Sequence, residues 1–223
     1  MTDRISEKHF ADFCRGLGFV VKKIQRTNQP TADFEVRTPE ITVIAEVKEL
    51  TGGANALALL EKFAEERSIS VSSKPGRLAT SQIKNASIQV ASSAHNQPAI
   101  VVLYSNISRE NLPAIMPDEH VSHEDIDAAM YGDLTVYVAL GRHSIGGPCY
   151  NVPKSGESLA ARHRHISAIA VLSGFTNKHL NIYHNRYAKL PLPMTSFCGS
   201  GIRHYFKEER GEKQLAGWNP VEE

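Results

Sequence analysis

Asp33, Glu46 and Lys48 are the residues of this chain whose types and spacing best suit catalysis. Two carboxylates that lie close together repel each other, and a buried charge without a partner is costly. A divalent cation removes both costs, and Mg²⁺ binds one or two carboxylates while it keeps several waters for the phosphate oxygens of a substrate. A lysine two residues from a metal ligand can orient a water or stabilise negative charge on phosphate. These three residue types therefore suit metal-dependent hydrolysis of a phosphoester.

A two-stranded hairpin over residues 30–50 is expected to bring the three side chains together. Residues two apart in a strand share one face. On the first strand, this alternation predicts one face with Asp33, Glu35 and Arg37 and the opposite face with Ala32, Phe34 and Val36. On the second strand, it predicts Glu46 and Lys48 beside Ile44, with Val43, Ala45 and Val47 on the opposite face. Residues 38–40 form the turn, because Pro39 drives the preceding residue into an extended conformation. The motif alone leaves a plain surface hairpin equally open.

Asp33 followed by Glu46-Val47-Lys48 resembles the core signature of the PD-(D/E)XK nuclease superfamily, whose members share the restriction-endonuclease-like fold. Ala32 stands where that signature usually has proline. The resemblance implies Mg²⁺ or Mn²⁺ as the cofactor, with Asp33, Glu46 and the Val47 carbonyl as ligands. It also implies that Lys48, together with the two carboxylates, is a catalytic residue.

The first helix is expected over residues 6–18, where Ser6 is a suitable N-cap and apolar side chains recur at helical spacing. Its buried stripe is expected to consist of Phe10, Phe13, Cys14 and Leu17. Glu7 lies at the edge of this stripe. The resemblance implies a glutamate on this helix that approaches the metal site, so Glu7 is a candidate accessory residue. The alternative is a first-turn glutamate that complements the helix dipole.

A second pattern lies on a helix expected over residues 80–94. The run Ile83-Lys84-Asn85-Ala86-Ser87-Ile88-Gln89 resembles the I-K-x-A-x-x-Q pattern of a helix that packs over the catalytic hairpin in many members of the superfamily. The apolar run 98–104 follows at once and is typical of a central strand covered on both faces. The resemblance implies that Gln89 is a catalytic residue and that Gln82 and Lys84 are accessory residues at the border of the site. One face of this helix is expected to consist of Gln82, Ala86, Gln89 and Ser93.

The other segments predict the outer parts of the fold. The expected elements are a strand at 19–25, a helix at 54–67, a loop at 68–79, a helix that begins near Ser122, a strand at 134–140 as the fifth of the core sheet, a loop at 141–158, and strands at 166–172 and 180–184 as an antiparallel extension. Lys74 and Arg77, both in the loop at 68–79, are candidates for contact with a nucleic-acid backbone. A solvated loop without such a role is the alternative.

These elements together predict the α/β class, with a restriction-endonuclease-like mixed sheet flanked by helices and a C-terminal β extension. One domain is expected over residues 1–206, with its core at about 5–140 and the strand extension at 141–206. Residues 207–223 are expected to form a charged, loosely held tail.

Composition narrows the classes of function. The chain has 223 residues and a net charge of +1, so any contact with DNA has to come from local basic patches. No apolar run approaches the roughly 18 residues of a membrane span, and the N-terminus has no apolar stretch of the signal-peptide type. Three widely spaced cysteines predict reduced thiols, so a cytoplasmic protein is expected. The chain has no G-x-x-x-x-G-K-[ST] loop, so no ATP is expected, and its ten histidines show no HExxH spacing.

The sequence thus predicts a Mg²⁺-dependent deoxyribonuclease with DNA as its partner. Two alternatives stay open. The first is a non-catalytic protein of the nuclease fold that binds DNA or a protein partner, and the second is an unrelated α/β binding protein whose hairpin mimics the motif. Because many members of the superfamily cut both strands as dimers, the resemblance also implies a homodimer as one arrangement to test.

Overall fold

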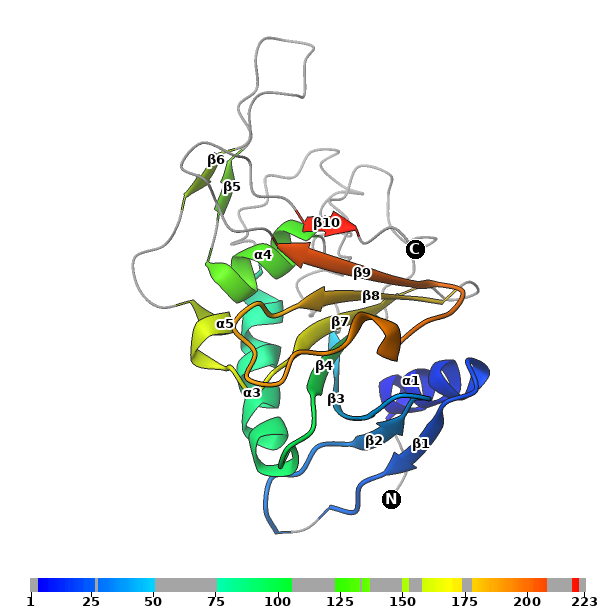
Figure 1. The fold of residues 1–223 in the computed structure, drawn as a ribbon. Helices are drawn as coiled ribbons and strands as arrows, with labels where there is room; N and C mark the ends of the chain where they lie inside the picture. The colour runs from blue at the N-terminus through cyan, green and yellow to red at the C-terminus, as the bar shows by residue number, and fades with distance from the viewer. Residues whose placement is uncertain are drawn as a thin grey trace, which may run out of the picture.

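A mixed β-sheet with helices on both faces forms the centre of the molecule (Figure 1). The structure is a computed structural model that describes residues 4–26, 28–50, 76–105, 123–132, 134–136, 150–152, 158–173, 178–207 and 218–220. Within these ranges the chain is of the α/β class, as the sequence predicts.

The described helices are α1 (Ile5–Gly16), α3 (Arg77–Ser93), α4 (His123–Tyr131), α5 (Leu159–Arg162) and the short 3-10 helix η2 (Met194–Ser196). The described strands are β1 (Val20–Lys23), β2 (Phe34–Arg37), β3 (Thr42–Leu50), β4 (Ala99–Ser105), β5 (Leu134–Val136), β6 (Tyr150–Val152), β7 (Ala168–Ser173), β8 (His179–His184), β9 (Ile202–Lys207) and β10 (Trp218–Pro220).

Eight of these strands form the main sheet, in the order β1-β2-β3-β4-β7-β8-β9-β10. The first three strands are an antiparallel meander, and β4 then runs parallel to β3. Strand β7 runs parallel to β4, β8 is antiparallel to β7, and β9 runs parallel to β8. The centre of the sheet, β4 and β7, is buried on both faces, which explains the unbroken apolar runs of these strands.

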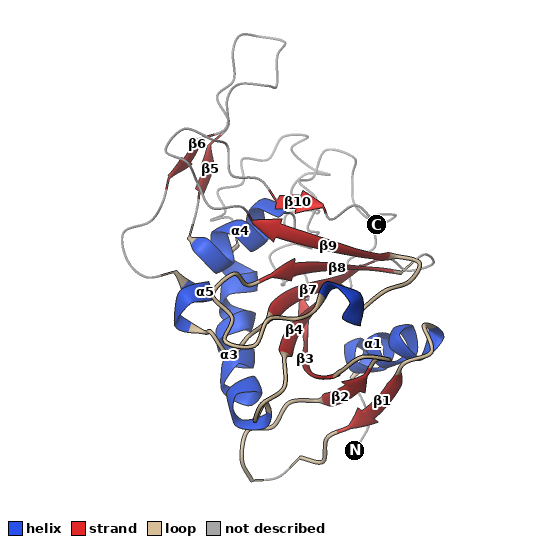
Figure 2. Ribbon diagram, in the orientation of Figure 1, coloured by secondary structure: helices blue, strands red, loops and turns tan. Residues whose placement is uncertain are grey.

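Helices lie on both sides of this sheet (Figure 2), and an apolar cluster lies on each side. Helices α3, α4 and α5 contribute to the cluster on one side, and α1 contributes Phe10, Ala11 and Cys14 to the cluster on the other. On β3 the side chains alternate between the clusters: Ile44 faces α3, while Val43 and Ala45 face α1. The alternation expected for the second strand of the hairpin is therefore confirmed for these residues.

Helix α1 begins one residue earlier than expected. Arg4 is its N-cap and makes no side-chain capping bond, while Ser6 lies inside the first turn with a buried hydroxyl that has no partner among the described residues. The expectation that Ser6 caps the helix is wrong, because the chain enters the helix before this residue. The end of the helix agrees with the sequence: Gly18 has a φ of +82°, and its N–H donates to the Arg15 carbonyl at 2.9 Å.

Helix α3 also starts earlier than expected. Gly76 precedes it with a φ of +70°, and its N–H donates to Asp125 Oδ1 at 2.7 Å. A Cβ at position 76 would lie 2.5 Å from the Asp125 carbonyl oxygen, so only glycine allows this approach to α4. Arg77 is consequently the first residue of a helix. The expectation that Arg77 lies in a loop is therefore wrong. Lys74 and the helix expected at 54–67 lie outside the described residues.

The expected fifth strand of the core sheet is not where the sequence placed it. Strand β5 ends at Val136 and pairs with β6 in a separate two-stranded sheet, and β6 lies inside the segment expected to be a loop at 141–158. Strand β7 occupies the fifth position instead, next to β4. An apolar run predicts a strand but carries no information about its partner, and this explains the error.

The described C-terminal strands, β9 and β10, are part of the main sheet. Strand β9 was not expected, and β10 pairs with it from within the supposed tail at 207–223. Lys207 is buried and forms an ion pair with Asp127 of α4. The antiparallel pairing of β7 with β8 is as expected, but both strands belong to the same sheet as the hairpin. In the described part of the chain no helix is both long and apolar enough to cross a membrane.

Candidate active site

The hairpin brings Asp33 and Glu46 close together. Strands β2 and β3 pair from Arg37 with Thr42 to Phe34 with Ala45, so Asp33 directly precedes the first paired residue of β2. Its carboxylate is held against β3 by the Val47 N–H, and its negative charge acts on Glu46. The turn is held by Thr38, whose N–H and hydroxyl both donate to the Ile41 carbonyl, at 2.9 and 3.1 Å.

Both carboxyl groups of this pair are buried, with 4 % of Asp33 and 1 % of Glu46 exposed. Asp33 Oδ2 accepts a hydrogen bond from the Val47 N–H at 3.0 Å, and its Oδ1 lies 3.4 Å from Arg26 Nη2. Glu46 Oε1 pairs with Lys48 Nζ at 2.7 Å, while Oε2 is buried and has no hydrogen-bond partner among the described residues. Within the described part of the chain, one oxygen of the pair is therefore left unsatisfied, which native proteins rarely allow.

The electrostatics of Glu46 follow from this geometry. Burial, and after it the negative charge of Asp33, raise the pKa of Glu46 to about 8, although Lys48 acts in the opposite direction. With a pKa of about 8, Glu46 keeps a proton near neutral pH. A cation between the two groups would remove the reason to hold that proton.

Helix α3 fixes the position of Lys48. The ammonium group donates to Gln89 Oε1 at 2.6 Å, and the amide nitrogen of Gln89 donates to the Thr31 carbonyl at 3.2 Å. Gln89 thereby connects Lys48 to the segment that leads into β2. The C-terminal end of α3 holds the same segment through Ser93, whose hydroxyl accepts a hydrogen bond from the Ala32 N–H at 2.9 Å. This part of the helix packs over the hairpin, as the sequence predicts.

Glu7 reaches the neighbourhood of the carboxylates through other residues. Its side chain is only 1 % exposed and pairs with Lys23 Nζ at 2.7 Å and with Arg26 Nη2 at 3.2 Å. Arg26 is the same side chain that contacts Asp33. Glu7 is thus a buried residue paired with basic side chains, and not an exposed first-turn glutamate.

The remaining predicted site residues are not brought to the carboxylates by described contacts. Lys84 is exposed and five residues before Gln89, which places it on a different side of α3. Its charge acts on His163, whose pKa is lowered by burial, His165, Arg162 and then Lys84. Gln82 is half-buried on the same face as Gln89, two turns earlier, and Arg77 is exposed at the start of the helix.

Ala32 corrects one detail of the predicted faces. It packs in the cluster on the α3 side, with Ile44, and not with Phe34 and Val36 on the α1 side. The reason is that β2 begins at Phe34, so strict alternation does not extend back to position 32. The predicted faces hold within the strand, where Phe34 and Val36 are buried and Arg37 is exposed.

Arg26, Lys23 and Thr31 are parts of this site that the sequence analysis missed. Lys23 ends an edge strand, and Arg26 and Thr31 lie in polar connections, where basic and hydroxyl side chains are common. The one available signal is that all three lie within ten residues of Asp33. That spacing alone does not separate them from solvated residues.

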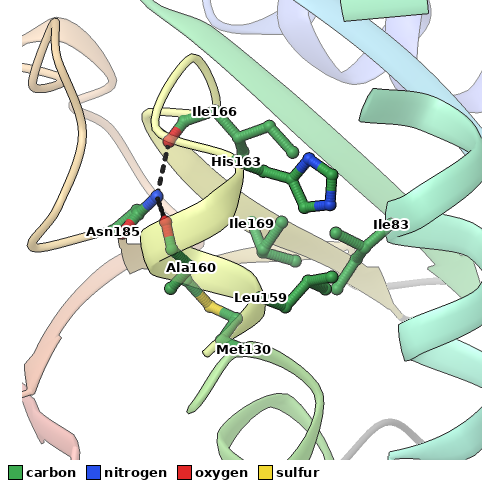
Figure 3. A pocket seen from close by; sticks show the side chains of 8 residues that line it. All are labelled: Ile83, Met130, Leu159, Ala160, His163, Ile166, Ile169 and Asn185. Carbon is green, nitrogen blue, oxygen red and sulfur yellow. Dashed lines mark hydrogen bonds between the residues drawn. The ribbon is translucent and has the colours of Figure 1, made fainter. Parts of the chain in front are cut away.

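A pocket lies beside α5 and differs in character from the carboxylate site (Figure 3). Its lining comes from α3, α4, α5, β7 and the connections around them, and consists of Ile83, Met130, Leu159, Ala160, His163, Ile166, Ile169 and Asn185. Asn185 donates to the Ala160 and Ile166 carbonyls at 3.1 and 2.9 Å, so its amide nitrogen is already used. The pocket is mainly apolar and offers no group of carboxylates.

Comparisons with protein-family models, with curated proteins and with solved structures find no match to this chain. The site is therefore judged by its own geometry. Among the described residues, no group of three or more histidine, cysteine, aspartate and glutamate side chains is arranged to hold a metal ion. Two carboxylates with a main-chain carbonyl form a smaller set, and the unsatisfied Glu46 oxygen, the adjacent Asp33 and the lysine beside them suit a divalent cation.

Proposed function

We propose that this chain is a metal-dependent nuclease of the PD-(D/E)XK type, which hydrolyses phosphodiester bonds in DNA. One observation carries the proposal. Two adjacent, buried carboxyl groups leave one oxygen without a partner among the described residues, and a lysine held by a glutamine lies against the same carboxylate. A structural hairpin has no reason to bury this incomplete arrangement, because each unsatisfied or repelling group costs stability.

The order of the elements supports the same proposal. Helix α1 is followed by the antiparallel strands β1, β2 and β3, and α3 leads to β4, which lies beside β3. The restriction-endonuclease-like fold implied by the sequence resemblance has this opening and this helix over the hairpin. We infer that α1 to β4 is the nuclease core and that β7 to β10 extend its sheet.

Each residue of the proposed site has a role that its contacts support. Asp33, Glu46 and the Val47 carbonyl would hold Mg²⁺ or Mn²⁺, which supplies positive charge that lowers the pKa of a water and stabilises negative charge on phosphate. The Lys48 ammonium orients the attacking water or contacts the phosphate oxygen on which charge develops. Gln89 positions Lys48, since its amide oxygen accepts from that ammonium and its nitrogen is fixed by a main-chain carbonyl.

The test is a cleavage assay with purified protein on linear, circular, nicked and branched DNA, and on RNA of the same sequence. We expect cleavage of DNA with Mg²⁺ or Mn²⁺ and none in EDTA. Full activity in EDTA would refute the proposed chemistry. Binding of DNA without cleavage of any substrate would favour the non-catalytic alternative. Sedimentation of the same samples, with and without DNA, tests for the homodimer that the resemblance implies.

A further inference from the structure

Three basic side chains surround the carboxylate of Glu7. Lys23 Nζ lies 2.7 Å from one Glu7 oxygen, and Arg26 Nη2 and Arg4 Nε lie 3.2 and 4.0 Å from the other. The Glu7 side chain is 1 % exposed, whereas those of Lys23 and Arg26 are 38 and 40 % exposed. The anion is therefore inside, and the cations that it holds present part of their surface to solvent.

This arrangement argues against a metal-ligand role for Glu7. Both of its oxygens already accept from a cation, in contrast to Glu46, which has one oxygen without a described partner. Ion pairs and hydrogen bonds of this kind offset the cost of removing a carboxylate from water, so Glu7 needs no metal ion for that purpose. Its effect on the surroundings is to fix two long, otherwise mobile cationic side chains at chosen positions.

Arg26 connects this cluster to the proposed catalytic centre. Its Nη2 lies 3.2 Å from Glu7 and 3.4 Å from Asp33 Oδ1. Around the centre, the side chains of Arg4, Lys23, Arg26 and Lys48 face those of Glu7, Asp33 and Glu46. In these described ion pairs, four cations face three carboxyl groups, so their formal charges sum to +1. Such a surplus suits an anion, and a guanidinium matches the oxygens of a phosphate group in a bidentate geometry.

We propose that Lys23 and Arg26, positioned by Glu7, bind a backbone phosphate of the nucleic acid next to the bond that is cut. This inference rests on the proposed nuclease function and assigns to Glu7 a positioning role in place of metal ligation. The two cations come from the end of an edge strand and the connection that follows it, so a nucleic-acid strand can reach them from solvent. Because Arg26 Nη2 lies 3.4 Å from Asp33 Oδ1, the phosphate bound by Arg26 would be adjacent to the scissile one.

The first measurement is binding of a short DNA duplex in EDTA, where no cleavage occurs, by fluorescence anisotropy at several salt concentrations. Arg26→Ala and Lys23→Ala should each weaken binding about tenfold and lower the salt slope by about 1. Arg26→Lys should retain part of the affinity. Arg15→Ala is the matched control, because it removes the same charge from an exposed site on α1 where Arg15 pairs with Asp12 at 3.2 Å. It should stay within about twofold of the wild type, as expected for a screened surface charge.

The second measurement is Mn²⁺ affinity by calorimetry without DNA. Glu7→Gln should bind Mn²⁺ as the wild type does, while Asp33→Asn should lose most of the affinity. Circular dichroism checks that each variant is folded; either alanine variant leaves the buried Glu7 carboxylate with two of its three described cations.

Two results would overturn the inference and leave the nuclease proposal standing. One is equal DNA binding by the wild type, Arg26→Ala and Lys23→Ala in a protein that cuts DNA. The other is a tenfold loss of Mn²⁺ affinity in Glu7→Gln, which would make Glu7 a ligand. A wild type that neither binds nor cuts DNA would instead refute the proposed function itself.

Discussion

The β2–β3 hairpin and two histidine clusters, His184 with His204 and His163 with His165, all contain buried or half-buried titratable groups, but they satisfy them differently. In the hairpin, Glu46 keeps one oxygen without a described partner, although Asp33 and Lys48 are adjacent. In the first cluster, His204 Nε2 donates to the Phe197 carbonyl at 2.8 Å, and its Nδ1 shares a hydrogen bond with His184 Nε2, also at 2.8 Å. Both ring nitrogens of His204 therefore have hydrogen-bond partners.

Ser87 completes the contrast. Its hydroxyl lies 2.6 Å from His163 Nδ1 and 2.9 Å from His165 Nε2, and the latter nitrogen also donates to the Ser87 carbonyl at 3.1 Å. Ser87 can then donate to His163, and burial lowers the pKa of both histidines so that they stay neutral. A serine with two histidines has the residue types of a nucleophilic site, yet each of these contacts ties the group to its own protein. The comparison teaches that an incomplete set of partners is a better sign of function than residue type.

The largest expected effect is on cleavage. Asp33→Asn, Glu46→Gln and Lys48→Ala should each lower the initial rate of DNA cleavage by more than about 10²-fold, because each removes charge that holds the cation or stabilises the transition state. Ser87→Ala and His184→Gln should leave the rate within about threefold, since their partners are structural. Rates are measured at saturating Mg²⁺ on variants that circular dichroism shows to be folded. Undiminished cutting by Asp33→Asn would break the comparison, and so would a folded Ser87→Ala without activity.

The next effect is on stability, and the two regions should respond to pH with opposite signs. Burial, and then the nearby His204, lower the pKa of His184 to about 3, while the unfolded chain takes up its proton near 6.5. The free energy of unfolding should therefore decrease as the pH falls from 6.5 toward 3. For Glu46, the pKa of about 8 exceeds its ordinary 4.5, so the unfolded chain releases a proton that the folded chain keeps. The free energy of unfolding should decrease as the pH rises from 4.5 to 8.

Urea denaturation in EDTA at pH 4, 6 and 8 measures how the free energy of unfolding changes in both pH ranges. Each group contributes at most about 5 kcal/mol over its window, at 1.36 kcal/mol for each pKa unit. His184→Gln should reduce the loss of unfolding free energy toward pH 4 alone. Glu46→Gln should reduce the loss toward pH 8 and make the protein more stable than the wild type at pH 8. A Glu46→Gln curve that runs parallel to the wild type at all three pH values would show that the carboxylates are not under strain.

The contrast also explains what the sequence could predict. Alternation along β3 and the spacing on α3 are local, so the faces of Glu46, Lys48 and Gln89 followed from the residues themselves. Pairing between distant segments is not local. Nothing in the run at 134–140 indicates that β5 joins β6, and nothing in β9 indicates that it receives β10.

Arg26 illustrates the same limit within the site. A basic residue in a polar connection is common, and its meaning depends on two acidic partners that are 19 and 7 residues away. The starts of α1 and α3 were misplaced for a related reason. Ser6 and the residues around Thr80 have the local character of helix starts, but α1 begins at Ile5 and α3 begins at Arg77. For α3, the contact between Gly76 and Asp125 of α4 decides the boundary.

The smallest expected effect separates the two sides of α3. Gln89→Ala should lower kcat about tenfold, which corresponds to about 1.4 kcal/mol, and leave KM nearly unchanged, because Lys48 loses the acceptor that orients it while substrate contacts stay. Lys84→Ala should stay within about twofold, since its exposed side chain lies on a different side of the helix. Steady-state kinetics on one DNA substrate compares them, with Gln89→Glu as a variant that keeps an acceptor for the ammonium. If Lys84→Ala raises KM by a larger factor than Gln89→Ala lowers kcat, the nucleic acid approaches over the side of α3 that faces His163. The division between a catalytic and a structural region would then be wrong.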